Sequence, residues 1–163
     1  MSEARFHSVF DIIGPVMIGP SSSHTAGASK IGHVVRKIFG EEPEKIDVYL
    51  YASFAKTYRG HGTDLAIIGG LLGMGPDDSN LADSLAIARK RGIKVTFIPK
   101  STQVHHPNTA RIVLTRGKHK LDVVGESIGG GNIRISEIDG FSISLSVGVP
   151  TYIEIHRDVP GMV

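Results

Sequence analysis

The 163-residue sequence contains no cysteine and no tryptophan, and each absence excludes a class of site. Without cysteine, this chain can form no disulfide and can offer no thiolate to a metal ion or an iron–sulfur cluster. Aromatic residues make up only 6% of the sequence. A platform of rings on which nucleic-acid bases could stack is therefore not expected.

An excess of charge of one sign is also lacking, because 18 Lys and Arg residues face 16 Asp and Glu residues, for a net charge of +2. Such a balance does not indicate a nucleic-acid-binding or membrane-binding surface. No run reaches the roughly 18 consecutive apolar residues of a membrane span. Residues 1–16 also lack the apolar core and cleavage site of a secretory signal. We therefore expect a cytoplasmic protein that binds neither nucleic acid nor membrane.

Glycine, in contrast, is frequent, with 20 residues, and much of it is clustered beside polar residues. Gly60 and Gly62 flank a histidine, Gly69 and Gly70 are adjacent, and 129–131 is a run of three. Clustered glycines mark tight turns, or places where the backbone comes close to a ligand or to another backbone. The loops are therefore expected to carry the function.

The spacing of hydrophobic residues predicts a chain that begins with mixed helix and strand and ends with antiparallel strands. Helices are expected over 26–39, closed by Gly40, over 62–72, and over 81–91 with Asn80 as the N-cap. Strands are expected over 46–52, 93–98, 110–115, 119–125, 132–138 and 141–147. This order predicts an α+β fold, with a mixed β-sheet packed with helices.

The most polar cluster is the stretch GPSSSHTAG, residues 19–27. Ser22 or Ser23 fits the N-cap of the following helix, whose first turn would present free N–H groups and the positive end of the helix dipole to a carboxylate or phosphate. His24 could add a charged donor or act as a base. The residue types leave two interpretations open: a capped helix start with solvated serines, or an anion site.

A second cluster, GHGTD, covers residues 60–64. Glycine on both sides of His61 leaves its imidazole open. Asp64 could fix the tautomer of His61, or it could simply serve the start of the next helix. The alternative to a functional histidine is a helix-start turn with an exposed ring.

Two further clusters are weaker on their own. His105 and His106 could bind a metal, but adjacent residues of an extended chain point in different directions and no third ligand is near, which favours an exposed loop. The glycines after Ser127 could form a nest of N–H groups for an anion, or a bulge or turn, and the turn is favoured for this cluster alone.

Taken together and in this order, GPSSSHTAG, GHGTD, GGLLG, PD, HPN and SIGGG closely resemble the β chain of the iron–sulfur-dependent, two-chain bacterial L-serine dehydratase. The domain also resembles the allosteric substrate-binding domain of some phosphoglycerate dehydrogenases. The tail is similar to the opening strand and turn of an ACT domain. We therefore expect one β-chain domain over 1–150, and the start of a truncated or missing ACT-like domain over 151–163.

The resemblance implies a reaction in which L-serine loses water to give aminoacrylate, which becomes pyruvate and ammonia. It implies a [4Fe–4S] cluster bound by the cysteines of a partner, the α chain, which agrees with the absence of cysteine here. The expected partners are therefore the α chain and L-serine, and the isolated chain could form a homodimer.

The resemblance and the chemistry together suggest roles for individual residues. His61 is the first candidate for the base that takes the α-proton, and His24 is the second, as base or as partner of the substrate carboxylate. The expected substrate- or anion-binding residues are Ser21, Ser22, Ser23, Thr25, Gly62, Thr63, Asp64, Asn108, Gly129 and Gly130. Two alternatives remain: a regulatory module that binds serine or an anion, and, more weakly, a metal site at His105 and His106.

Overall fold

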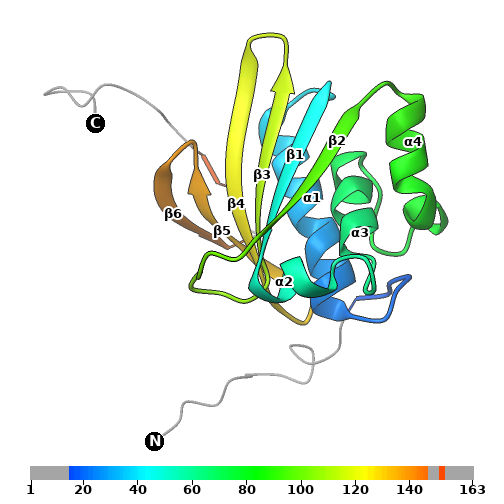
Figure 1. Ribbon diagram of the computed structural model, residues 1–163, viewed down its shortest axis with the longest axis vertical. Coiled ribbons are helices and arrows are strands. Elements are labelled where there is room, and N and C mark those ends of the chain that lie inside the picture. Colours follow the sequence, from blue (N-terminus) through cyan, green and yellow to red (C-terminus); the bar gives the residue numbers. More distant parts are fainter. Residues whose placement is uncertain (1–14, 147–150, 153–163) are drawn as a thin grey trace, which may run out of the picture.

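A computed structural model describes residues 15–146 and 151–152, in which one β-sheet is packed against helices (Figure 1). The strands are β1 (Lys45–Tyr51), β2 (Lys94–Lys100), β3 (Thr109–Arg116), β4 (His119–Gly129), β5 (Asn132–Ile138) and β6 (Phe141–Ser146). The helices are α1 (Ala28–Phe39), α2 (Ala52–Thr57), α3 (Thr63–Leu71) and α4 (Ser84–Lys90), with a π-helical turn η2 (Ser22–Gly27) and a 3₁₀ turn η3 (Ser79–Asp83).

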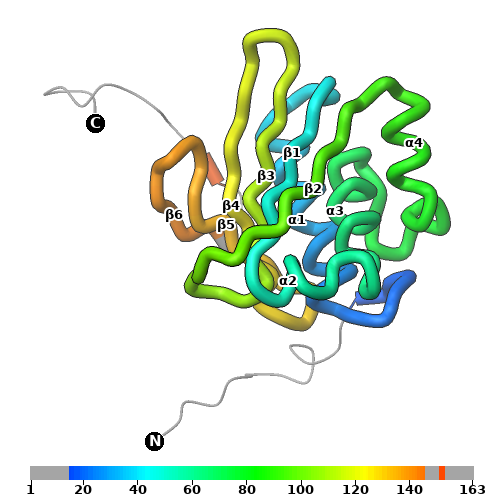
Figure 2. Tube along the Cα trace, viewed as in Figure 1, coloured from blue at the N-terminus to red at the C-terminus, as the bar shows by residue number. Residues whose placement is uncertain are grey.

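The six strands form one sheet in the order β2-β1-β3-β4-β5-β6. β1 and β2 are parallel, and each later neighbour is antiparallel. A parallel pair needs a long crossover, which α2, α3 and α4 supply between β1 and β2, as the path of the chain in Figure 2 shows. The predicted α+β fold with a mixed sheet is therefore confirmed.

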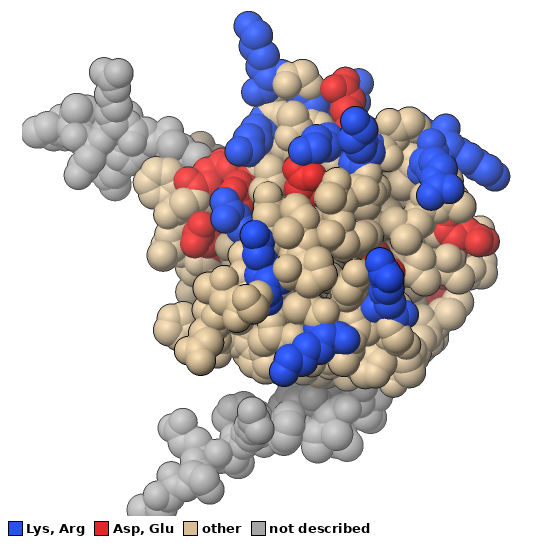
Figure 3. Space-filling model, viewed as in Figure 1, with Lys and Arg blue, Asp and Glu red and all other residues tan. Residues whose placement is uncertain are grey.

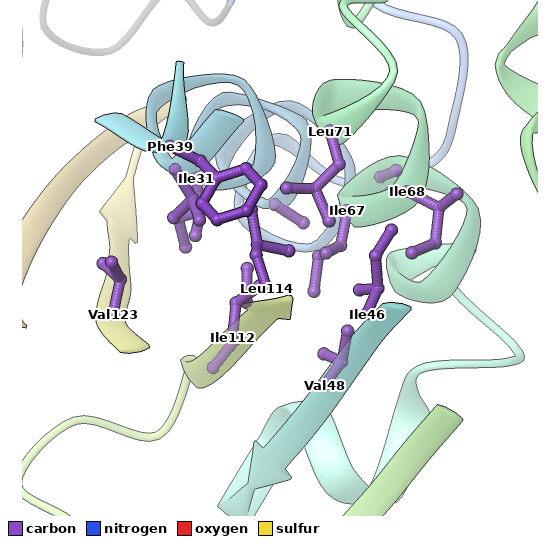
Figure 4. Close-up of a cluster of buried hydrophobic side chains, with 14 of the residues drawn as sticks. Ile31, Phe39, Ile46, Val48, Ile67, Ile68, Leu71, Ile112, Leu114 and Val123 are labelled. Carbon is purple, nitrogen blue, oxygen red and sulfur yellow. The ribbon is translucent and has the colours of Figure 1, made fainter. Parts of the chain in front are cut away.

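One hydrophobic core lies between the sheet and the helices α1 and α3. Ile46, Val48 and Leu50 alternate along β1 and are fully buried, because successive side chains of a strand point to opposite faces. Figure 4 shows the buried residues of neighbouring elements turned toward the same space: Ile31, Phe39, Ile67, Ile68, Leu71, Ile112, Leu114 and Val123. This core holds the start of α1 and the start of α3 at fixed positions over the sheet.

Two glycines let α1 and α3 approach closely. A Cβ atom on Gly70 would overlap the carbonyl oxygen of Ser29, and one on Gly32 would overlap the carbonyl oxygen of Ile67. Glycine lowers helix propensity, yet these positions require it for packing. The helix expected over 62–72 therefore forms as α3, despite Gly69 and Gly70.

The N-cap predicted at Ser22 or Ser23 is wrong. Helical structure begins at Ser22 as the π-helical turn η2, and the Ser21 hydroxyl caps it by accepting a hydrogen bond from the His24 N–H at 3.1 Å. The cap lies earlier because this wider turn starts before the apolar spacing from which the helix was predicted.

The strand expected over 46–52 ends one residue early, and the sequence analysis missed α2. Ala52 has a φ of 43° and starts α2 directly after β1. The β-branched and aromatic residues before this point predict a strand that continues to Ala52. A left-handed alanine has no clear sequence signal, since this conformation normally favours glycine.

The N-cap predicted at Asn80 is also wrong. The Asp78 carboxylate caps the 3₁₀ turn η3 by accepting from the Asn80 N–H at 2.8 Å, and α4 begins only at Ser84. An aspartate that bonds two residues ahead favours this tighter turn. The apolar stretch SVFDIIG also predicts a short helical turn at 8–14. This turn, the last residue of the strand expected over 141–147, and most of the ACT-like segment 151–163 lie outside the described residues.

The face of the sheet turned to the viewer in Figure 1 carries charges of both signs. Arg111 pairs with Asp122 at 2.6 Å, and Arg134 pairs with Glu126 at 2.5 Å. Figure 3 shows Lys and Arg side chains spread over this face, with Asp and Glu among them, and no single basic patch. Within the described ranges, no helix is long and apolar enough to span a membrane.

Candidate functional site

The start of α1, the start of α2 and the β4–β5 hairpin meet at the lower end of the molecule in Figure 1. Backbone hydrogen bonds join these segments: the Ser53 N–H donates to the Pro107 carbonyl at 2.9 Å, and the Ser127 N–H donates to the Asn108 carbonyl at 2.9 Å. The loop with the two histidines therefore touches both α2 and β4. The fold brings all four polar clusters of the sequence to one end of the sheet.

His24 lies at the centre of this region, with both ring nitrogens in hydrogen bonds. Its Nδ1 is 3.1 Å from the Ser23 hydroxyl and 3.4 Å from that of Ser21, and its Nε2 is 3.1 Å from the Ser53 hydroxyl. The residue is only 8% exposed. Three hydroxyl groups from two elements therefore hold the imidazole in one orientation.

His24 and His61 form a pair. Their ring centroids are 4.9 Å apart in an edge-to-face arrangement, and the Phe54 ring contacts His24 from another side at 5.2 Å. Burial lowers the pKa of His24 below its usual value, and the charge of His61 lowers it further. Both effects favour the neutral form of His24.

His61 has the opposite surroundings, as its flanking glycines predict. Its side chain is exposed, and within the described ranges its ring makes no hydrogen bond. Its backbone is fixed, because its N–H donates to the Thr57 carbonyl at 3.0 Å and its carbonyl accepts from the Thr25 hydroxyl at 3.4 Å. The imidazole is thus free to meet a ligand, while the main chain beneath it is held.

Thr63 and Asp64 follow His61 at the start of α3, after Gly62 in a left-handed conformation. The Asp64 carboxylate accepts from the Leu65 N–H at 2.9 Å, and burial raises its pKa. Within the described structure no hydrogen bond joins Asp64 to the His61 ring. This geometry agrees with the alternative in which Asp64 serves the helix start.

Three buried side-chain oxygens around the site have no hydrogen-bond partner among the described residues: Thr63 Oγ1, Asn108 Oδ1 and Ser127 Oγ. An unpaired buried polar group costs about 1–3 kcal/mol. Ser127 packs against η2, since a Cβ atom on Gly27 would overlap its hydroxyl. Unsatisfied buried groups of this kind are few in native structures.

The N–H groups of the first helical turn are partly used by the chain itself. The Thr25 N–H donates to the Ser21 carbonyl at 2.8 Å, and the His24 N–H donates to the Ser21 hydroxyl. In the described structure the Ser22 and Ser23 N–H groups make no hydrogen bond. Any anion at this turn would therefore meet these two amides and the serine hydroxyls, which is a smaller set than an ordinary helix start offers.

The glycine run forms the β4–β5 hairpin. Gly129, Gly130 and Gly131 have φ values of 102°, 59° and 77°, and the strand register shifts between Ser127 and Gly129. The turn interpretation of SIGGG is therefore confirmed. A cavity of about 510 Å³ lies beside this hairpin and is lined in part by Lys30, His33 and Gly130.

Comparison with known proteins agrees with these motifs. A model of the family described as "Serine dehydratase beta chain" matches residues 8–94. A probable L-serine dehydratase β chain of Bacillus subtilis is 51% identical over 98% of this chain. The chain belongs to the serine dehydratase β-chain family.

The similar proteins differ in how much of their length this chain covers. It spans 72% of the Bacillus subtilis β chain. It spans 63% of the L-serine dehydratase β chain of Peptoniphilus asaccharolyticus, with 41% identity over 84% of this chain. A D-3-phosphoglycerate dehydrogenase of Synechocystis sp. is 23% identical over 83% of this chain, which covers 25% of that relative.

In this member of the β-chain family, the sequence analysis missed three site residues. Ser53 and Phe54 follow the strand expected over 46–52 and were assigned to no element, so no signal placed them beside His24. Ser127 opened the SIGGG motif, but its own role was not recognised. Only the fold brings these residues to the start of α1.

The donor atoms of this β-chain family member do not fit an iron–sulfur cluster. The sequence has no cysteine, and the described residues contain no group of three His, Cys, Asp or Glu side chains that could hold a metal ion. His106 Nδ1 accepts from the Asn108 N–H at 3.2 Å, which supports a role in shaping the loop. A cluster would need thiolates from another chain.

Proposed function

We propose that this chain is the β subunit of an L-serine dehydratase that converts L-serine to pyruvate and ammonia together with a cysteine-bearing α chain. The observation that carries the proposal is the His24–His61 pair, with ring centroids 4.9 Å apart, surrounded by serine and threonine hydroxyls at the start of η2. This set combines groups that can move a proton with groups that can hold a carboxylate.

The substrate carboxylate is bound at the start of η2. The Ser22 and Ser23 N–H groups have no partner there within the described ranges, and the hydroxyls of Ser21, Ser22 and Ser23 add donors. A carboxylate accepts several such bonds, and the positive end of the helix favours its charge. The wall around this position is completed by six further residues: Thr25, Gly62, Thr63, Asn108, Gly129 and Gly130.

His61 takes the α-proton of L-serine on an imidazole nitrogen. It is exposed and its ring is free of hydrogen bonds, so a nitrogen can face the substrate. His24 is less suited, because both of its nitrogens are engaged by hydroxyls. Loss of the α-proton and of the hydroxyl group as water leaves aminoacrylate, which hydrolyses to pyruvate and ammonia.

Reconstitution tests the proposal. The chain alone, even with added iron and sulfide, is expected to be inactive, because it has no ligands for a cluster. Mixing it with a cysteine-bearing α chain under anaerobic conditions is expected to give L-serine-dependent pyruvate formation. Turnover by the chain alone, or inactivity of the reconstituted pair, would contradict the proposal.

The base assignment is tested in the same reconstituted pair. His61→Ala should lower kcat by about 10²-fold or more, the usual contribution of a general base, and raise KM far less. His105→Ala is the control, since this histidine lies in the loop and should leave kcat unchanged. If His61→Ala scarcely changes kcat, the base is another group.

The serine hydroxyls and free amides at the start of η2 also suit a second function, a regulatory module that binds serine or an anion. The same hydroxyls and amides would then hold a ligand without chemistry. Calorimetry of the isolated chain with L-serine and with inorganic phosphate separates the two. Tight binding without the α chain supports the module, and binding only in the assembled enzyme supports the catalytic subunit.

A further inference from the structure

Ser53 lies where β1 runs directly into α2, without a connecting loop. Ala52, the first residue of α2, has a φ of 43°, in the left-handed region that alanine rarely adopts. A strained residue of this kind persists only where the surrounding structure requires it. Here the sharp bend turns the first residues of α2 toward the start of α1.

The first amides of α2 do not use the Ser53 hydroxyl. Serine often caps a helix with its side chain, but α2 has no side-chain cap. Instead, the Pro107 carbonyl accepts hydrogen bonds from the Ser53 N–H at 2.9 Å and from the Phe54 N–H at 3.4 Å. The loop before β3 therefore satisfies the helix start. The Ser53 hydroxyl is left to meet His24, with its Oγ 3.1 Å from Nε2.

The geometry points to Ser53 as a positioning residue that holds His24 Nε2 and so sets the orientation of His24 against His61. Ser53 and Phe54 are consecutive, and both contact the same imidazole, one through a hydrogen bond and one through its ring at 5.2 Å. Ser23 holds the opposite nitrogen at 3.1 Å. The ring therefore cannot turn without losing hydrogen bonds at both nitrogens.

A hydroxyl suits this position because it can both donate and accept. It accepts from Nε2–H in one tautomer and donates to the Nε2 lone pair in the other, so the contact persists in both tautomers. Residues that orient metal-binding histidines typically contribute about 10–100-fold to activity, and we expect an effect at the lower end of this range for Ser53. The consequence for catalysis rests on the proposed function, whereas the hydrogen bond itself can be tested without it.

The first test is nuclear magnetic resonance of the histidine side chains in the full-length chain, without a partner. Ser53→Ala should shift the His24 Nε2 resonance, because that nitrogen loses its hydrogen-bond partner, while Ser53→Thr, which keeps the hydroxyl, should resemble the wild type. Ser101→Ala is the matched control, since Ser101 is an exposed serine and its removal should leave all eight histidines unchanged. If Ser53→Ala fails to fold, Ser53→Cys keeps the volume with a weak hydrogen-bonding group and should give the same shift. Unchanged His24 resonances in a folded Ser53→Ala or Ser53→Cys chain would overturn the inference.

The second test uses the enzyme reconstituted with the α chain. Ser53→Ala should lower kcat by about ten-fold, change KM by less than about two-fold, and move the acidic limb of the pH–rate profile. Ser53→Thr should restore most of kcat, and Ser101→Ala should match the wild type. If Ser53→Ala keeps the wild-type kcat and pH profile, Ser53 does not position a catalytic group. If the wild-type pair is inactive, the proposed function fails, while the resonance measurement still decides whether Ser53 holds His24.

Discussion

Two histidines in edge-to-face contact have opposite surroundings. His24 is buried, hydrogen-bonded at both nitrogens and favoured in its neutral form, whereas His61 is exposed with a free ring. Two close imidazoles cannot both carry a charge without repulsion. At the scale of single residues, the site is therefore an asymmetric pair in which one ring is fixed and the other can react.

The buried histidine predicts a pH-dependent stability. Burial holds the pKa of His24 below its usual value in the folded chain, so that near pH 6 the unfolded chain binds more protons. This contribution to the free energy of unfolding is full above about pH 6.5 and declines as the pH falls below that value. Urea unfolding between about pH 5 and about pH 8 should therefore show a smaller pH dependence for His24→Gln than for the wild type.

His33 supplies the comparison for this measurement. Its pKa is also lowered by burial and by Lys37. The His24→Gln chain should therefore keep part of the dependence of its unfolding free energy on pH, and His33→Gln should remove a separate part of that dependence. A wild-type slope in the His24→Gln chain would show that His24 titrates normally in the folded state.

At the scale of elements, the site depends on how closely α1 and α3 pack. His24 precedes α1, and His61 precedes α3. Gly32 and Gly70 bring the two helices into backbone contact, which fixes the separation of the two helix starts. Larger side chains at these positions would move the two histidines apart.

Gly70→Ala should therefore destabilise the chain by about 1–3 kcal/mol. Its Cβ would overlap the backbone of α1, and neither helix can move away without losing packing contacts. Gly60→Ala is the matched control, since the nearest atom to a Cβ there is 3.8 Å away, and it should change stability by less than about 0.5 kcal/mol. Urea denaturation midpoints provide the measurement. Equal midpoints for the two variants would show that the helix contact is looser than described.

At the scale of the whole molecule, exposed apolar side chains lie around the site. Val16, Ile18 and Ile128 are 83%, 47% and 50% exposed. Pro15 contacts Gly131 in the β4–β5 hairpin, and Ile128 lies near the end of β4 in the same hairpin. The segment with Val16 and Ile18 therefore lies beside this hairpin. Exposed apolar residues grouped around a polar site are typical of a surface that a partner covers.

If an α chain completes the site, Ile128→Glu should weaken its binding by about ten-fold or more without lowering the melting temperature of the chain. Phe141→Glu is the control, because Phe141 is also exposed, at 65%, but starts β6 at the edge of the sheet. Sedimentation of the mixed chains measures the effect. Equal binding by both variants would place the partner elsewhere, and loss of self-association in Ile128→Glu would instead indicate a homodimer of the isolated chain.

Much of the fold was predictable because local spacing and tertiary packing agree. The apolar spacing over 26–39 and the strands of the second half form as expected, and Asp139 and Gly140, both with positive φ, make the turn between β5 and β6. The caps were not predictable, since several neighbouring serines, aspartates or asparagines could serve. α2 was missed because its start depends on a strained Ala52 that no local pattern indicates.

The sequence by itself determined the family, the α+β class and the polar motifs, because these follow from residue types and their order. Only the tertiary structure decided how the motifs combine. Ser53, from an unpredicted helix, reaches His24 across 29 positions of sequence, and burial makes His24 the fixed member of the pair while His61 stays open. Such roles depend on desolvation and on contacts between distant segments, which a linear pattern of residues does not contain.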